Sequence, residues 1–381
     1  LLCATIYDFL SIPPISSMLD GTVNDVGEYT SIAIGADGLP VISYSDATNK
    51  ALIVAKCNDA ACSGGNESIS LVDGPANTVG PYNSMAIGAD GLPVISYYGA
   101  GAQALKVAKC NDAACSGGDE SISFVDDPVN WVGGFNSIAI GTDGLPDFTY
   151  FDFTAGALKV AKCNDAACSG GNEIITTVDD PVNTVGYHTS IAIGTDGLPV
   201  ISYQAPGAQA LKVVKCNDAA CSGGNETITT VDAQGNDVGY YTSIAIGTDG
   251  QPVISYFDLT AGALKATKCN EAACSGGDER TSFVDDPVNT VGLFSSIAIG
   301  KDGLPVISYF DAIAGTLKVA KCNDAACSGG DETITTADDP VNTVGYYTSI
   351  AIGTDGLPVI SYQDFTGTTL QVIKCFKPGC N

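Results

Sequence analysis

The chain has 381 residues, of which 43 are acidic and 16 are basic, so its formal net charge is −27. A surface this acidic repels phosphate backbones, which excludes nucleic acid as a partner. No apolar run approaches the length of about 18 residues that a membrane-spanning helix needs. The 45 glycines and 17 prolines punctuate short β-prone segments, a pattern typical of an all-β protein.

The chain is built from one unit of 53 residues that recurs seven times. No unit contains an insertion. The glycine of a D-G turn recurs every 53 residues, at Gly38, Gly91, Gly144, Gly197, Gly250, Gly303 and Gly356. We therefore expect a ten-residue N-terminal extension (residues 1–10) followed by a single domain over residues 11–381.

The first predicted element is a strand at about residues 14–20. Residues 16–27 (SSMLDGTVNDVG) align without a gap on residues 69–80, which carry the fourth strand of the next unit. The last unit ends just after its cysteine pair and lacks this strand. We expect the N-terminal strand to complete the last unit, and deletion of residues 1–22 to destabilise the fold by exposing a strand edge.

Each full unit then contains four strand-like segments separated by turn signals. In one unit they are residues 189–194, 198–203, 210–216 and 226–232. T-D-G between the first two favours a tight hairpin, because glycine tolerates positive φ. Four short antiparallel strands at this period predict a seven-bladed β-propeller with the first strand of each unit innermost.

Fourteen of the fifteen cysteines form C-x₄-C pairs between the third and fourth strands. Zinc would need four ligands around one centre, and redox motifs of the thioredoxin type use a different spacing. A disulfide needs nothing else, so we predict one clamp per blade: Cys57–Cys62, Cys110–Cys115, Cys163–Cys168, Cys216–Cys221, Cys269–Cys274, Cys322–Cys327 and Cys375–Cys380.

The disulfides place the protein in an oxidising compartment, so we expect it to be secreted or at the cell surface. Asn66 and Asn225 begin glycosylation sequons. Cys3 is left without a partner. It is open whether Cys3 belongs to a frayed terminus, forms an interchain bridge or carries a lipid.

Two loop faces differ among the units. The face with the D-G turns and cysteines hardly varies, whereas the opposite face carries an aromatic or histidine residue before each innermost strand: Tyr29, Tyr82, Phe135, His188, Tyr241, Phe294 and Tyr347. Acids follow the second strands at Asp46, Asp152, Asp258, Asp311 and Asp364. Aromatic faces stack on sugars and carboxylates accept hydroxyl hydrogen bonds, so this set is a candidate sugar site, with Trp131 as an extra contact. The alternative is that the rings only pack between blades.

Paired acids followed by proline occur four times, at residues 126–127, 179–180, 285–286 and 338–339. Paired carboxylates of this kind can ligate calcium through oxygen. We favour the alternative of a turn closed by proline, and so expect no metal or cofactor.

The pattern G-T-D-G-L-P-V-I-S-Y resembles the turn motifs of sialidase-like and related extracellular propeller repeats, over the whole chain as an architecture. The resemblance implies a β-propeller. It does not carry over sialidase activity, because sialidases of that family hold the substrate carboxylate with three arginines and this chain has only Arg280.

Catalysis receives little support from the residues. A serine triad needs a histidine base, and His188 stands where sister units have Tyr or Phe. Glycosidase-type carboxylate pairs stay open because acids are abundant, yet no unit has the insertion expected of a catalytic centre. We therefore expect a non-enzymatic structural subunit or binding module of a surface assembly, with self-association or contacts to other surface proteins. The alternative is a multivalent carbohydrate-binding propeller.

Overall fold

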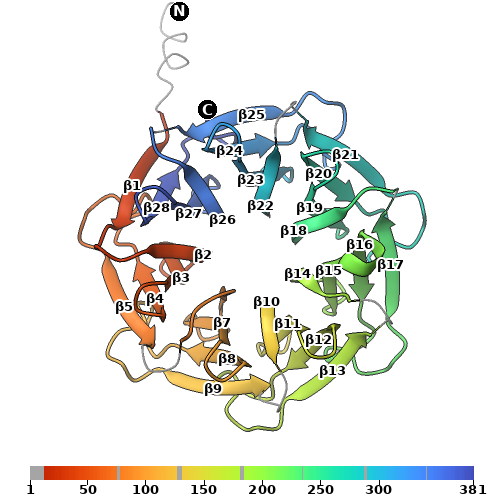
Figure 1. Cartoon of the computed structure of the whole chain (residues 1–381), viewed down its shortest axis with the longest axis horizontal. Coiled ribbons are helices and arrows are strands. Elements are labelled where there is room, and N and C mark those ends of the chain that lie inside the picture. The colour runs from red at the N-terminus through yellow and green to blue at the C-terminus, as the bar shows by residue number, and fades with distance from the viewer. Residues whose placement is uncertain are drawn as a thin grey trace, which may run out of the picture.

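The computed structural model is a closed ring of seven four-stranded antiparallel sheets (Figure 1). It describes residues 13–74, 78–126, 131–180, 184–233, 235–286, 290–339 and 341–381. The predicted all-β propeller is confirmed, with one 3₁₀ turn, η1 (Pro206–Ala208), among the described residues.

Each blade runs from an innermost strand near the axis to an outermost strand at the rim (Figure 1). The strands are, blade by blade and from inside outward, β2 (Val26–Ile34), β3 (Pro40–Asp46), β4 (Ala51–Lys56) and β5 (Ser68–Asp73); β6 (Ser84–Ile87), β7 (Pro93–Gly99), β8 (Ala104–Lys109) and β9 (Ser121–Asp126); β10 (Val132–Ile140), β11 (Pro146–Asp152), β12 (Ala157–Lys162) and β13 (Ile174–Asp179); β14 (Tyr187–Ile193), β15 (Pro199–Ala205), β16 (Ala210–Lys215) and β17 (Thr227–Asp232); β18 (Val238–Ile246), β19 (Pro252–Asp258), β20 (Ala263–Lys268) and β21 (Arg280–Asp285); β22 (Val291–Ile299), β23 (Pro305–Asp311), β24 (Thr316–Lys321) and β25 (Thr333–Asp338); and β26 (Val344–Ile352), β27 (Pro358–Asp364), β28 (Thr369–Lys374) and β1 (Ile15–Asp20).

The ring closes as predicted, through the N-terminal strand. β1 pairs antiparallel with β28, from Ile15 opposite Lys374 to Asp20 opposite Leu370. The Asp20 carboxylate then accepts a hydrogen bond of 2.7 Å from the buried Tyr44 hydroxyl in the first blade. The last blade is therefore bound to the first by both backbone and side chain.

The same Tyr-to-Asp bond joins every pair of neighbouring blades. Seven fully buried tyrosines of the second strands each donate to the aspartate that ends the outermost strand of the preceding blade, at 2.5–2.7 Å. These acceptors include the first acid of each D-D-P motif, at Asp126, Asp179, Asp285 and Asp338. Among the described residues, no group of three or more His, Cys, Asp or Glu side chains is placed to hold a metal ion.

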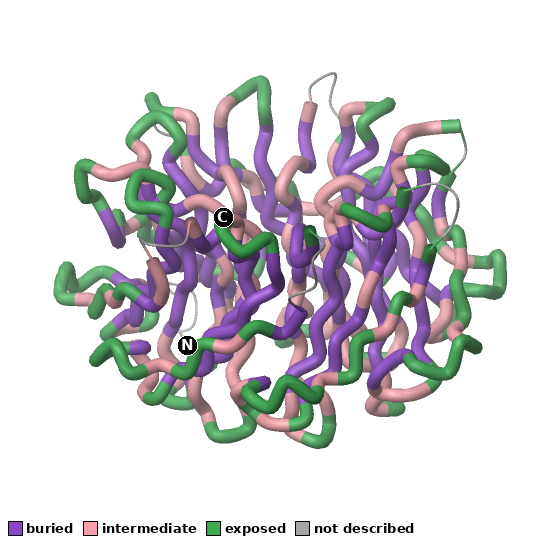
Figure 2. Tube along the Cα trace, turned by 60° about the horizontal axis from the view of Figure 1, so that its bottom comes forward, coloured by how far each residue is buried: buried purple, intermediate pink, exposed green. Residues whose placement is uncertain are grey.

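The hydrophobic core lies between blades, because each cluster of buried side chains joins residues of two neighbouring blades. Figure 2 shows buried strands and largely exposed loops. The second strands are buried along their whole length, whereas the outermost strands bury only their ends. The innermost strands are further joined by serine hydroxyls that accept the neighbouring blade's backbone N–H, for example Ser31 from Met85 at 3.0 Å. Each blade is thus bonded to both of its neighbours, which fixes the innermost strands around the axis.

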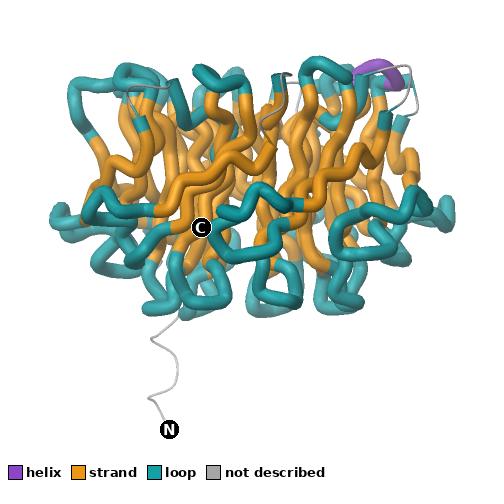
Figure 3. Tube along the Cα trace, turned by 90° about the horizontal axis from the view of Figure 1, so that it is seen from below, coloured by secondary structure: helices purple, strands orange, loops and turns teal. Residues whose placement is uncertain are grey.

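All seven predicted disulfides are present. They lie with the D-G turns on one face, which we call the clamp face; the opposite face, which carries η1, is the aromatic face (Figure 3). Asn66 and Asn225 are exposed in the clamp loops, and Cys3 lies outside the described residues. Within the described part of the chain, no helix is long and apolar enough to cross a membrane.

Candidate functional site

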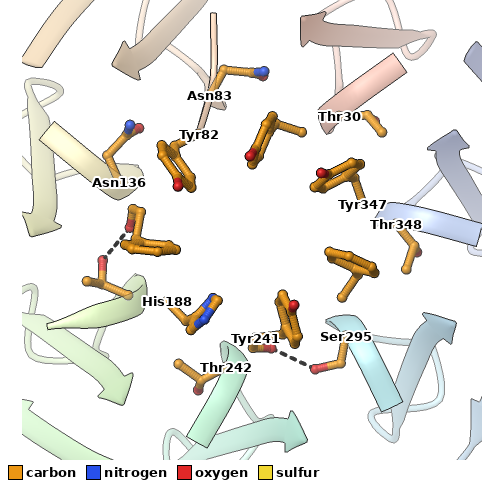
Figure 4. Close-up of a pocket in the computed structure, with 14 residues that line it drawn as sticks. Thr30, Tyr82, Asn83, Asn136, His188, Tyr241, Thr242, Ser295, Tyr347 and Thr348 are labelled. Carbon is orange, nitrogen blue, oxygen red and sulfur yellow. Dashed lines mark hydrogen bonds between the residues drawn. The ribbon is translucent and has the colours of Figure 1, made fainter. Parts of the chain in front are cut away.

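Seven ring-bearing side chains surround the axis near the aromatic face (Figure 4). Each adopts a left-handed backbone conformation, with φ between 49° and 55°, which residues other than glycine rarely adopt. The pairing of the innermost strand shifts register at this point, as between Glu28 and Ser31. Such a bulge re-aims a side chain, and here it turns each ring toward the axis. We call the set the aromatic belt: Tyr29, Tyr82, Phe135, His188, Tyr241, Phe294 and Tyr347.

The aromatic belt is continuous. Every ring contacts both neighbours, with centroids 4.5–4.8 Å apart and planes tilted by 38–59°. The sequence placed these residues near the axis, and the structure brings all seven together. Whether they bind a ligand stays a prediction, because tilted rings in mutual contact also stabilise the ring of blades.

Two cavities adjoin the belt. One, of about 390 Å³, is lined by the seven rings alone. The other, of about 180 Å³, is lined by the rings and by the small polar residue that follows each of them: Thr30, Asn83, Asn136, Thr189, Thr242, Ser295 and Thr348. Apolar ring faces beside hydroxyl and amide groups match the mixed surface of a sugar.

The belt is not uniform in polarity. Hydroxyl groups gather at Tyr82, Tyr29 and Tyr347, which we call the polar arc, where burial and the neighbouring hydroxyls raise the pKa of Tyr29. Phe135 and Phe294, which flank this arc, offer no hydroxyl, and His188 and Tyr241 complete the belt. Burial lowers the pKa of His188 to about 3, so its imidazole is neutral at pH 7.

Glu28 breaks the symmetry beside the polar arc. At this position the other six units have Pro81, Gly134, Tyr187, Tyr240, Leu293 and Tyr346. Burial raises the pKa of the half-buried Glu28, and the nearby Asp25 raises it further. Glu28 in turn raises the pKa of Tyr347 and of Tyr29, so the carboxyl group lies close to the polar arc. We did not single out Glu28 from the sequence, although aligning the repeats shows it as the only acid at its position.

Asp25 is held beside Glu28 by an amide from the last blade. The Gln363 Nε2 group donates to Asp25 Oδ1 at 3.0 Å and to the Val26 carbonyl at 3.2 Å. The Asp25 backbone N–H donates to Thr48 Oγ1 at 2.9 Å. Two of the other junctions hold an aromatic pair at these positions, Phe151 with Tyr187 and Phe310 with Tyr346. The junction of the fourth and fifth blades again has a glutamine and an aspartate, Gln204 and Asp237, but Tyr240 in place of the glutamate. The junction of the last and first blades is therefore a polar site with two carboxyl groups.

The five predicted acids after the second strands are bound in their own turns, and a ligand-binding role for them stays a prediction. None of them lines either cavity, and neither do Glu28 and Asp25. They are buried in their own turns, where backbone N–H groups two or three residues later donate to them, as Ala261 does to Asp258 at 2.8 Å. Their carboxylates are already occupied by the N–H groups of these turns. The set is Asp46, Asp152, Asp258, Asp311 and Asp364.

No family model and no curated protein sequence matches this chain. Solved structures do match it. A Dyadobacter fermentans protein of unknown function aligns with a TM-score of 0.59 at 10% identity, over 94% of this chain and 98% of its own. A polysaccharide lyase aligns with a TM-score of 0.54 at 10% identity, over 90% and 89%. An α-L-arabinofuranosidase from Fusarium graminearum aligns at 0.52 and 11%, over 95% and 97%. These likenesses show the fold.

The comparisons correct our expectation of a non-enzymatic protein. The solved propellers that match this chain are mostly enzymes, glycosidases and a lyase. Our argument relied on the lack of an insertion in any unit. That argument was wrong because catalysis needs only a few side chains, and a single substitution such as Glu28 breaks the symmetry of the ring without changing its length.

Proposed function

We propose that the protein is an extracellular glycoside hydrolase that cleaves a neutral glycan at the polar arc of the aromatic belt. The observation that carries the proposal is Glu28, the only acid at its position among the seven units, half-buried and with a raised pKa. Glycosidases need a carboxylic acid that is still protonated when it meets the glycosidic oxygen.

The belt supports a sugar as the ligand. The faces of Tyr29 and Tyr347 offer stacking surfaces for sugar CH groups, and their hydroxyls offer hydrogen bonds to sugar hydroxyls. The seven disulfides fit an oxidising, extracellular location, where glycans are abundant.

The charges support a neutral sugar. The residues that line the two cavities include no lysine or arginine. Arg280 begins β21, an outermost strand, and is remote from the axis (Figure 1). An anionic sugar would also approach a chain of net charge −27. A sialic acid or uronic acid would therefore meet no counter-ion here.

In this proposal Glu28 is the general acid that donates its proton to the departing glycosidic oxygen. Asp25 supplies the second carboxylate, which stabilises the positive charge that develops on the sugar. Water then adds to the anomeric carbon and returns a proton to the Glu28 carboxylate. Gln363 positions Asp25 through the 3.0 Å hydrogen bond. The raised pKa of Glu28 keeps it protonated to higher pH than an ordinary glutamate.

The test is the release of reducing ends from a panel of neutral polysaccharides: arabinan, xylan, galactan, mannan and β-glucan. We expect Glu28→Gln to lower kcat by about 100-fold or more, because general acid catalysis is lost. Asp25→Asn should also abolish activity, because the second carboxylate is lost. Asp237→Asn is the matched control. Asp237 is the residue of the fifth unit that corresponds to Asp25, but the residue there that corresponds to Glu28 is Tyr240.

The pH profile gives an independent check. Activity should fall as pH rises through the pKa of Glu28, on the alkaline limb of the profile, at a pH above the ordinary glutamate value. An inactive wild-type protein on every polysaccharide, or a fully active Glu28→Gln variant, would refute the proposal.

A further inference from the structure

A second aromatic surface lies on the aromatic face of the third blade. Trp131 stacks on Phe153 with centroids 4.4 Å apart and planes within 20°. Trp131 is 43% exposed and is the only tryptophan of the chain. We call this pair the tryptophan platform. A large ring left open to water on an acidic protein is typical of a binding contact.

The tryptophan platform is held in place before any ligand arrives. The Phe153 backbone N–H donates to the Trp131 carbonyl at 2.9 Å, and the Trp131 backbone N–H donates to Thr154 Oγ1 at 2.9 Å. The Trp131 side chain lies near the hydroxyl of Tyr98 in the second blade, whose pKa is raised by burial, a shift that the indole opposes. Both the main chain and the ring of Trp131 are therefore fixed, which lowers the entropic cost of binding.

The third unit is built for this arrangement. A Cβ atom at position 134 would overlap the Phe153 ring, so the glycine there makes room for the platform. Sister units have larger residues at this position, including Tyr187 and Tyr346. Trp131, Gly134 and Phe153 occur together in no other unit. Three substitutions in one unit thus serve one surface.

The platform is connected to the belt by an unbroken series of rings. From the polar arc the series runs through Tyr29, Tyr82, Phe135, Phe153 and Trp131, with successive centroids 4.8, 4.6, 6.3 and 4.4 Å apart. Such a track is longer than one sugar ring can cover. It begins beside Glu28, the proposed acid, and ends at an exposed indole.

We propose that the tryptophan platform binds a sugar residue of the same neutral glycan that is cleaved beside Glu28, so that the substrate is an oligosaccharide or polysaccharide rather than a single glycoside. This inference rests on the proposed function for the position of the cleaved bond. A flat pair of stacked rings, open to water at Trp131, matches the CH face of a sugar.

Trp131 is its own probe, because it is the only source of tryptophan fluorescence. The Glu28→Gln variant, which prevents turnover, is titrated with neutral oligosaccharides of increasing length prepared from the five polysaccharides. We expect one series to quench or blue-shift the emission above a threshold length, with no effect of its mono- and disaccharides.

Variants distinguish the platform from the rest of the belt. In the Glu28→Gln background, Phe153→Ala and Gly134→Ala should each weaken binding of the long oligosaccharide about tenfold, since one stacking contact is lost or displaced. Leu259→Ala is the matched control. Leu259 is 49% exposed and stands at the position of the fifth unit that corresponds to Phe153, outside this series of rings. It should leave the affinity unchanged.

The outcomes separate the two proposals. If oligosaccharides perturb Trp131 but the wild type cleaves nothing, the hydrolase proposal fails and the platform stands. If the wild type cleaves glycans and Trp131→Ala has equal kcat/KM on long and short substrates, the platform is refuted. No fluorescence response to any oligosaccharide also overturns it.

Discussion

At the residue scale, the belt depends on a backbone conformation that its side chains do not favour. Seven non-glycine residues at φ near 50° each store about 1 kcal/mol or more of backbone strain. The strain persists because neighbouring strands are bonded across the blades, as Ile32 N–H is to Ser349 Oγ at 3.2 Å. The sequence indicated the position of the rings. It could not indicate the positive φ, because none of the seven is a glycine or asparagine.

Asp147 is a second residue that departs from its repeat. It replaces a valine found in the other six units and is 1% exposed. Burial raises the pKa of Asp147 to about 6, although Lys162 lies 3.1 Å away and opposes the shift. Lys162 also pairs with Asp143 at 2.9 Å, as the equivalent lysines do in sister blades. The buried Asp147 carboxylate therefore destabilises the fold, and Lys162 does not need it as a partner because it already pairs with Asp143.

We predict that Asp147→Val stabilises the protein by about 2 kcal/mol at pH 7.5. A folded-state pKa above the unfolded value means that the folded state binds more protons between about pH 4 and 6. Stability is thus lost as pH rises through this range, and the variant escapes this loss. Urea unfolding of both proteins at pH 7.5 and pH 4 measures it. An equal gain at the two pH values would contradict the electrostatic explanation.

At the scale of elements, the clamped hairpin is the part of the blade that the repeat predicted best. Its disulfide was predicted from the spacing of the cysteines and from the absence of further metal ligands, and its hairpin turn from the D-G pair. These signals suffice because the structure of a hairpin depends on residues that are close in the chain. Outermost strands were harder to interpret. Their final aspartates looked like turn or calcium residues, whereas each accepts a hydrogen bond from the next blade, as Asp232 does from Tyr256.

We predict that Cys269→Ala with Cys274→Ala lowers the free energy of unfolding by about 2 kcal/mol, because a short covalent loop is opened in the unfolded chain. Amide hydrogen exchange should rise mainly in β20 and β21, which flank the clamp. The equivalent double variant at Cys216 and Cys221 is the comparison. Unfolding that is unchanged in both would show that the clamps do not stabilise the blades.

At the scale of the whole molecule, closure turns seven weak units into one fold. Each blade buries its second and third strands against its neighbours, so none has a complete core alone. The last blade depends on β1, which supplies its outermost strand and the Asp20 acceptor. Closure also brings Gln363 of the last blade to Asp25 of the first. The candidate site and the closure of the ring therefore share one interface.

We predict that deletion of residues 1–20 lowers the free energy of unfolding by roughly 3 kcal/mol or more, since β28 loses its partner and Tyr44 its acceptor. Chemical denaturation checks this. Deletion of residues 1–12 keeps β1 and is the control. The proposal that closure organises the site adds that the longer deletion should also impair glycan cleavage. A melting curve unaffected by the longer deletion would refute this closure.

The sequence by itself determined the blade, the number of blades, the clamps and the closure, because each follows from a period or from contacts between residues close in the chain. It also placed an aromatic residue near the axis in every unit. Only the tertiary structure decided which acids are bound in turns and which lie at the closing junction. Asp258 and its equivalents accept N–H groups of their own turns, whereas Asp25 meets Gln363 from the opposite end of the chain. Such a meeting has no local signature, because the distance between these side chains is set by the packing of seven blades around one axis.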